Sequence, residues 1–78
     1  MTERLSVDDR KINLTQVLKL AGWVGNGGEA KALIAEGLIR VNDEVETRKR
    51  RKMSVGDRVS MEDGPSLILV GQSPPPND

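Results

Sequence analysis

The chain has 78 residues and a formal net charge of zero, from 12 Lys plus Arg and 12 Asp plus Glu. It contains no Cys and no His, which excludes disulfides and thiolate metal sites and removes the commonest general base and metal ligand. Only 1% of the residues are aromatic, so we expect one small domain with an aliphatic core and no enzymatic activity.

The N-terminal segment, residues 1–11, is polar with scattered apolar positions such as Leu5 and Val7. It is predicted to form a short strand or an extended arm. Asp8 and Asp9 would turn the chain after it, because Asp favours turns through local hydrogen bonds.

A first helix is predicted for the segment LTQVLKLA at residues 14–21. Its apolar residues recur at i, i+3, i+4 and i+7, the stripe typical of an amphipathic helix. Asn13 or Thr15 can cap its N-terminus, and Gly22 with the glycines that follow would end it.

A second helix is predicted for residues 28–36, where Leu33 and Ile34 share one apolar face. Asn26 is a candidate N-cap, and Gly37 is the candidate left-handed residue that ends the helix. Because only a few residues separate the two helices, we expect them to pack as a helix-turn-helix-like pair.

The rest of the domain is predicted to form strands joined by turns. Alternating apolar residues predict strands over residues 39–41, 45–47 and 58–61. Residues 66–70 are nearly all apolar, which is typical of a strand that is central or covered on both faces. Residues 72–78 contain three prolines and are predicted to be a disordered tail. The elements together predict an α+β fold of two short helices packed on a small, mostly antiparallel sheet.

Nearly half of the positive charge of this neutral chain lies in one basic run of five consecutive residues: Arg48, Lys49, Arg50, Arg51 and Lys52. Adjacent like charges repel one another, so a polyanionic partner would favour the arrangement; the alternative is a charged edge that prevents aggregation. Neutralising about five phosphates would give a slope of about −3.5 to −4.5 for log affinity against log salt. Replacing Arg50 and Arg51 by Glu is predicted to weaken such binding and to leave the melting temperature nearly unchanged, because exposed charges contribute little to folding.

Residues 12–70 resemble a known family, the RNA-binding domain named after bacterial small-subunit ribosomal protein four, also called the alpha-L motif. The motifs that carry the resemblance are, in chain order, LTQVLKLAGW, GGEAKALIAEG, LIRVNDEVE and VGDRV. The run VETRKRRK is most similar to the stand-alone bacterial YbcJ-like subgroup. The resemblance implies an RNA-binding domain over residues 12–71 that contacts structured RNA (ribosomal, transfer or other), mainly through its phosphate backbone, with ribosome or ribonucleoprotein association.

One departure from the family pattern falls at the start of the second helix. Many family members have Ser-Arg there, with the Arg facing RNA, whereas this chain has Asn26 and Gly27. Asn26 keeps the capping role, and Lys31, one turn later, supplies part of the missing positive charge. The glycines at 25, 27 and 28 are interpreted as a flexible loop, or as a place where one RNA phosphate meets the helix N-terminus.

Other cations and the only aromatic residue complete the predicted site. Lys19 and Lys31 lie on the polar sides of the two helices, and Arg40 points away from the apolar residues of its strand. Trp23 either packs over the small core or stacks on an exposed base. The predicted RNA-binding residues are Arg48, Lys49, Arg50, Arg51, Lys52, Lys31, Lys19, Arg40 and Trp23.

The remaining expectations are negative ones, with one competing function. The acidic residues, Glu46 among them, are assigned to turns rather than to a metal or acid–base site. No apolar run approaches the roughly 20 residues of a membrane span, and MTERLSVDDRK lacks the apolar stretch of a secretory signal. We therefore expect a cytoplasmic monomer with no cofactor, no metal and no membrane contact. The alternative function is a protein-interaction module whose basic run docks an acidic partner.

Overall fold

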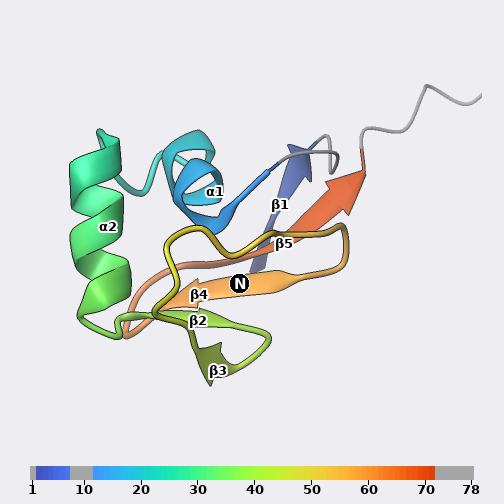
Figure 1. The fold of residues 1–78 in the computed structure, drawn as a ribbon. Helices are drawn as coiled ribbons and strands as arrows, with labels where there is room; N and C mark the ends of the chain where they lie inside the picture. The colour runs from blue at the N-terminus through green and yellow to red at the C-terminus, as the bar shows by residue number, and fades with distance from the viewer. Residues whose placement is uncertain (1, 8–11, 72–78) are drawn as a thin grey trace, which may run out of the picture.

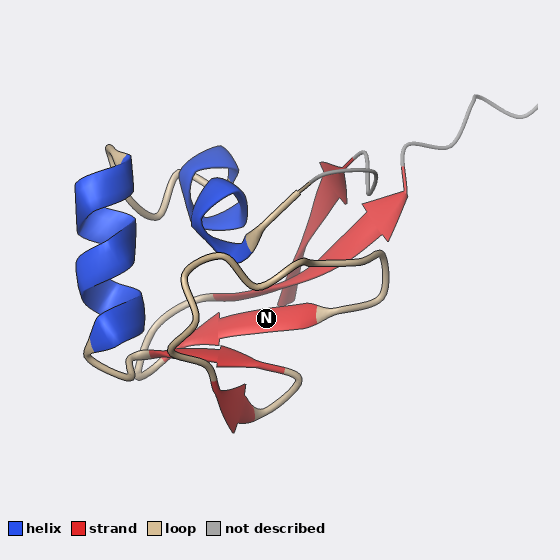
Figure 2. Cartoon of the chain, in the orientation of Figure 1, coloured by secondary structure: helices blue, strands red, loops and turns tan. Residues whose placement is uncertain are grey.

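The structure is a computed structural model that describes residues 2–7 and 12–71. In this part of the chain, two helices stand beside a five-stranded sheet (Figures 1 and 2). The elements are β1 (Thr2–Val7), α1 (Leu14–Leu20), α2 (Gly27–Ala35), β2 (Ile39–Val41), β3 (Glu44–Val45), β4 (Arg58–Met61) and β5 (Ser66–Gly71). Neither helix has the length and hydropathy to cross a bilayer. The predicted α+β class, with two short helices and a mostly antiparallel sheet, is confirmed.

Helix α1 begins at a capping box built from Asn13 and Gln16. The Asn13 side chain accepts a hydrogen bond from the backbone N–H of Gln16, and the Gln16 side chain accepts one from the N–H of Asn13, both at 2.9 Å. This pairing satisfies two N–H groups that the first turn would leave free. Leu14, Val17 and Leu18 of the apolar stripe are fully buried and Ala21 is partly buried, so the predicted cap and the predicted apolar face are both confirmed.

Helix α2 begins at Gly27, one residue earlier than the sequence predicted. Asn26 caps it by accepting a hydrogen bond of 2.9 Å from the N–H of Glu29. At the other end, Gly37 has a φ of 77°, the left-handed conformation that was predicted to end the helix. Of its apolar residues, Ile34 is fully buried, whereas Leu33 is only partly buried against the core.

The sheet has the strand order β1-β5-β4-β2-β3. Its pairs are antiparallel, except that β1 runs parallel to β5. The N-terminal segment is therefore a strand, the first of its two predicted forms. Strand β5 lies between β1 and β4, as expected for a central strand. The predicted turn at Asp8 and Asp9 and the predicted tail, residues 72–78, lie outside the described residues.

The prediction for residues 45–47 was partly wrong. Strand β3 is only Glu44–Val45, and the apolar residue of the predicted strand, Val45, is 53% exposed. Glu46, which follows, is buried instead, at 7% exposure. An apolar residue is normally the one to face the core, so the sequence alone gives no reason to expect burial of Glu46 in place of Val45.

The core lies between the helices and one face of the sheet. From the sheet, alternate residues such as Ile39 on β2, Val59 on β4 and Leu67 on β5 are buried in it. The residues between them face the other side, because successive side chains on a strand point to opposite faces. That second face is not covered by a helix (Figure 2). We call it the open face of the sheet, and it carries polar residues such as Arg40 and Ser60.

Candidate nucleic-acid interface

The basic run lies in a loop that is fixed at both ends by buried side chains. Glu46 precedes the run and is 7% exposed, and Met53 follows it and is fully buried. Between these two residues the chain is exposed, apart from Arg51, which is half-buried. The loop is therefore anchored to the domain, although its charged part lies at the surface.

Backbone hydrogen bonds attach the same loop to the start of α1. The N–H of Leu14 donates to the carbonyl of Arg51, and the N–H of Met53 donates to the carbonyl of Ile12, both at 2.9 Å. The hydroxyl of Thr15 donates to the carbonyl of Lys49 at 2.8 Å. These bonds place the basic run against the N-terminal end of α1, a position that chain order alone does not give.

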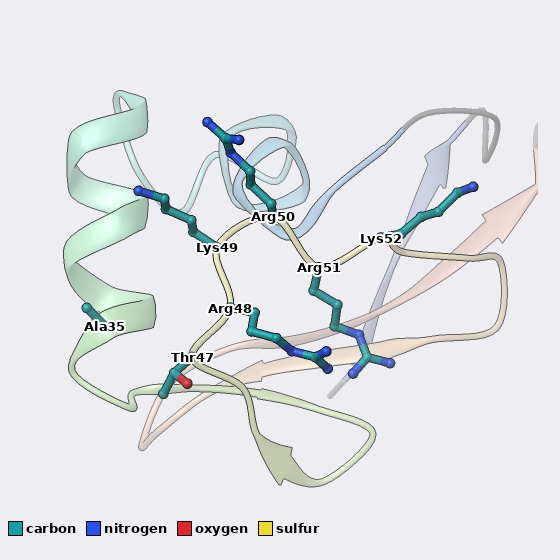
Figure 3. Close-up of a pocket in the computed structure, with 7 residues that line it drawn as sticks. All are labelled: Ala35, Thr47, Arg48, Lys49, Arg50, Arg51 and Lys52. Atoms are coloured by element: carbon teal, nitrogen blue, oxygen red, sulfur yellow. The ribbon is translucent and has the colours of Figure 1, made fainter.

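An open hollow separates the basic run from the last turn of α2. It is lined by Ala35 on the helix and by residues 47–52 of the loop (Figure 3). Five of its seven lining residues are cations, so the hollow is lined mainly by positive charge. A surface of this shape and charge is suited to a polyanion rather than to a small apolar ligand.

Two cations of the run are bound to Glu46. Nε of Arg48 donates to Oε2 of Glu46 at 3.0 Å and Nη2 of Arg48 donates to Oε1 at 3.1 Å, a two-bonded pair. Nη1 of Arg51 donates to Oε1 of Glu46 at 2.9 Å. The backbone N–H of Arg48 also donates to Oε2, at 2.9 Å. One buried carboxylate thus accepts four hydrogen bonds from two arginines.

The arginine contacts hold Glu46 in its charged form. The hydrogen bonds from the Arg48 side chain, and next those from Arg51, lower the pKa of Glu46 to about 2, although burial alone would raise it. The same contact raises the pKa of Arg48. Glu46 therefore carries a full negative charge at neutral pH.

This pKa predicts acid sensitivity. A carboxyl whose folded pKa lies below its unfolded value of 4.5 stabilises the protein above pH 4.5, and that contribution is lost as the pH falls from 4.5 toward 2. We expect the free energy of unfolding, measured by urea titration, to fall through this window. Glu46→Gln should flatten that part of the profile. Parallel profiles for the two proteins would contradict the assignment.

The other three cations of the run have no ion pair in the described part of the chain. Lys49, Arg50 and Lys52 are exposed and make no side-chain hydrogen bond there. Figure 3 shows these three side chains extending to one side of the loop, whereas the guanidinium groups of Arg48 and Arg51 extend together to the other. The run is thus divided into two cations that contact the protein and three that face solvent.

The division corrects one sequence-based expectation. Replacement of Arg50 and Arg51 by Glu was predicted to leave the melting temperature nearly unchanged. That prediction assumed that both side chains are exposed and unpaired. The assumption is wrong for Arg51, whose side chain is 29% exposed and hydrogen-bonded to Glu46. A carboxylate at position 51 would face the buried Glu46 carboxylate, so that double variant would lose stability as well as charge.

Lys19 and Lys31 lie on helix faces that meet the loop. Thr15, which contacts Lys49, is four residues before Lys19 on α1. Ala35, which lines the hollow, is four residues after Lys31 on α2. Residues four apart share a helix face, so each exposed lysine lies one helical turn from a residue that meets the loop or lines the hollow, and its contact with RNA stays a prediction.

Arg40 and Trp23 are placed differently. Arg40 lies on the open face of the sheet, opposite the helices, and forms an exposed ion pair of 3.4 Å with Glu62. Trp23 is partly buried and packs against the core, and it does not line the hollow. The structure therefore does not bring Arg40 to the basic run, and it favours the packing interpretation of Trp23.

The N-terminus of α2 already has an acidic partner. Oε1 of Glu29 accepts a hydrogen bond of 2.6 Å from the N–H of Gly25. This carboxylate disfavours a phosphate at the same place, one of the two interpretations of the glycine-rich segment. A Cβ atom at Gly27 would meet no atom within 4 Å, so a side chain can leave the backbone there without a clash at its first atom.

Glu46 is the site residue that the sequence analysis missed. Its spacing of five residues to Arg51 fits neither the helical nor the strand period, and its spacing of two to Arg48 would fit a strand, but strand β3 ends at Val45. Only the turn formed by the loop, closed by the N–H of Arg51 on the carbonyl of Arg48 at 3.1 Å, brings both arginines to it. Within residues 2–7 and 12–71, no group of three acidic side chains gathers to hold a metal ion.

Comparisons with known proteins identify a matching family and several similar proteins. Residues 5–69 match the model of the S4 domain. The chain is 44% identical over 70 residues to "Probable ribosome maturation protein RlbA" of Bacillus subtilis (strain 168), covering 90% of this chain and 99% of that protein. It is 49% identical over 49 residues to "Putative RNA-binding protein YbcJ" of Escherichia coli (strain K12), covering 63% and 70%. The solution structure of E. coli YbcJ, described as revealing an alphaL motif involved in RNA-binding, superposes with a TM-score of 0.68 at 39% identity, covering 90% of this chain and 89% of that one.

Proposed function

This chain belongs to the S4 domain family, as its motifs predicted, and from that premise we propose that it is a non-catalytic RNA-binding protein. The proposed ligand is structured RNA, held mainly through its phosphate backbone. The names of two relatives support the proposal, since one is called an RNA-binding protein and the other a ribosome maturation protein. We extend it to a cytoplasmic role on ribosomal RNA or a ribosomal precursor.

The observation that carries the proposal is the arrangement of free cations around the hollow. Lys49, Arg50 and Lys52 are exposed and line the hollow, and Lys19 and Lys31 lie one helical turn from Thr15 and Ala35, which contact the loop or line the hollow. Ammonium and guanidinium groups that have no protein partner are available for phosphate oxygens. Because Arg48 and Arg51 are already paired with Glu46, the loop itself should neutralise about three phosphates, with a salt slope of about −2.1 to −2.7.

Backbone contact is favoured over reading of bases. The chain has one aromatic residue, and Trp23 packs against the core away from the hollow, which leaves little surface for stacking unpaired bases. A duplex RNA presents phosphates and 2′-hydroxyls at its surface and hides its bases in a deep major groove. A fixed loop of cations suits such a ligand.

The alternative is a protein-interaction module that docks an acidic partner on the same hollow. Titrations with a hairpin RNA, a duplex DNA of equal length and an acidic polypeptide, all at two salt concentrations, separate the candidates. Our proposal expects the tightest binding to the RNA, with an affinity that falls as salt rises. RNA binding no tighter than that of a neutral control protein would reject it. Preference for the acidic polypeptide would favour the alternative.

Gly27 offers a test by gain of function. The resemblance implies that a cation at this position faces RNA, and the structure has open space there. Gly27→Arg is expected to tighten RNA binding by about tenfold, the effect of one charge-assisted hydrogen bond. Stability should change little, because two effects oppose each other. Replacing Gly raises the helix propensity of this position, whereas a cation near the helix N-terminus is unfavourable.

Gly27→Gln is the matched control for that variant. It places a polar side chain there without the charge, so it should be at least as stable as Gly27→Arg and bind RNA like the wild type. Equal affinity of the two variants would show that position 27 does not contact the ligand. Gel-shift titration and thermal melting give the two measurements.

A further inference from the structure

We infer that Glu46 is a positioning residue for RNA binding: its buried carboxylate holds the basic run in its binding-competent form. The inference rests on RNA binding as the proposed function and adds to it the group that fixes the geometry of the loop. It assigns a favourable role to an anion that lies beside five cations, where an anion would otherwise oppose binding to a polyanion.

The first step is the conformational problem that the run creates. Five adjacent cations repel one another, and an exposed loop that carries them has many conformations of similar energy. A ligand that binds one of these conformations must order the loop and its side chains, which weakens the observed affinity. A buried charged side chain that holds the loop in one conformation lowers this ordering cost before the ligand binds.

The second step is the geometry of Glu46. It is 7% exposed and accepts hydrogen bonds from the side chains of Arg48 and Arg51, which lie three residues apart in the loop. Contact with both arginines closes the turn between them, because each guanidinium must reach the same carboxylate. The backbone N–H of Arg48 adds a further bond to this carboxylate. The ion pairs of Glu46 with Arg48 and Arg51 thus hold the base of the loop, and we call them the clamp.

The third step is the effect of the clamp on the other cations. With Arg48 and Arg51 drawn to one side, the side chains of Lys49, Arg50 and Lys52 extend to the other side of the loop (Figure 3), and all three residues line the hollow. The carbonyls of Lys49 and Arg51 then accept the hydrogen bonds from Thr15 and Leu14 that attach the loop to α1. The carboxylate lowers the net charge of the loop from +5 to +4, and in exchange it fixes the direction of the three free cations.

Simple electrostatics and positioning predict opposite signs for Glu46→Gln. If the carboxylate acts only as a negative charge, its removal frees two arginines and RNA binding becomes tighter. If it positions the loop, binding becomes weaker, by about fivefold to tenfold, because the loop must be ordered when RNA binds. Glu44→Gln is the matched control: Glu44 is an exposed anion two residues away, with no ion pair or side-chain hydrogen bond in the described part of the chain. It should leave affinity unchanged or slightly tighter.

Amide hydrogen exchange without RNA gives a second readout. Glu46→Gln should speed exchange at the N–H groups of Leu14, Arg51 and Met53, which bond within the loop or between the loop and the start of α1, while Glu44→Gln should not. If Glu46→Gln does not fold, Arg48→Gln and Lys49→Gln replace it: each removes one cation, and only the former should speed exchange. Glu46→Gln with unchanged exchange and tighter RNA binding would overturn the inference. Wild-type protein that binds no RNA would instead reject the proposed function, and the exchange data would still test the clamp.

Discussion

Replacing Lys49, Arg50 and Lys52 together by Gln is expected to weaken RNA binding by on the order of a hundredfold. These three cations have no protein partner in the described structure, so their loss removes contacts to phosphate and none to the fold. The salt slope should become shallower by about 2 to 3, which reports directly on the phosphates released. The melting temperature should change by less than about 3 °C, because exposed charges contribute little to stability.

A second triple variant controls for net charge. Arg4, Arg40 and Arg58 are exposed cations whose side chains lie on the open face of the sheet, away from the hollow. Their replacement by Gln changes the net charge by the same amount, and their acidic partners, Glu62 and Asp43, are exposed as well. We expect this variant to bind RNA within about threefold of the wild type, since the removed charges lie on the open face of the sheet and do not line the hollow. Equal losses for both triple variants would assign the affinity to overall charge and not to the hollow.

The fold was largely predictable from the sequence because its signals are local. Asn13 and Asn26 precede apolar stripes of helical period, and Gly37 follows one, so caps and ends could be placed within a residue. The parallel pairing of β1 with β5 could not be predicted in this way. It joins residues about 64 positions apart, such as Thr2 and Ser66, and no local pattern in the polar N-terminal segment indicates its partner.

The candidate site was predictable in its location but not in its organisation. The run of five cations is visible in the sequence, and helical spacing places Lys31 near it once α2 is known. The split of the run depends on a buried carboxylate, and burial of Glu46 is favourable only because two arginines reach it. The approach of both arginines to Glu46 depends on the tertiary structure. A sequence rule that assigns acidic residues to turns therefore assigns Glu46 wrongly. Arg40 was misplaced for a related reason: its strand turns it to the sheet face opposite the helices.

Ile34→Ala is expected to lower the free energy of unfolding by about 2–5 kcal/mol, a large part of what a domain of this size has. Ile34 is fully buried between α2 and the sheet, so its removal loses apolar contact and leaves a cavity. The melting temperature should fall by roughly 10–30 °C. Leu33→Ala, at the preceding position of the same helix, should cost about half as much, because Leu33 is only partly buried.

The pair of α2 variants separates stability from binding. Neither side chain lines the hollow, so each variant, measured at a temperature where it is folded, should bind RNA as the wild type does. Urea titration and gel shift at 10 °C test both parts. A loss of stability at Leu33 as large as that at Ile34 would contradict the burial that distinguishes them. A loss of affinity in folded Ile34→Ala would mean that the core of α2 sets the shape of the hollow, because Ala35, the helix residue of that wall, follows Ile34 directly.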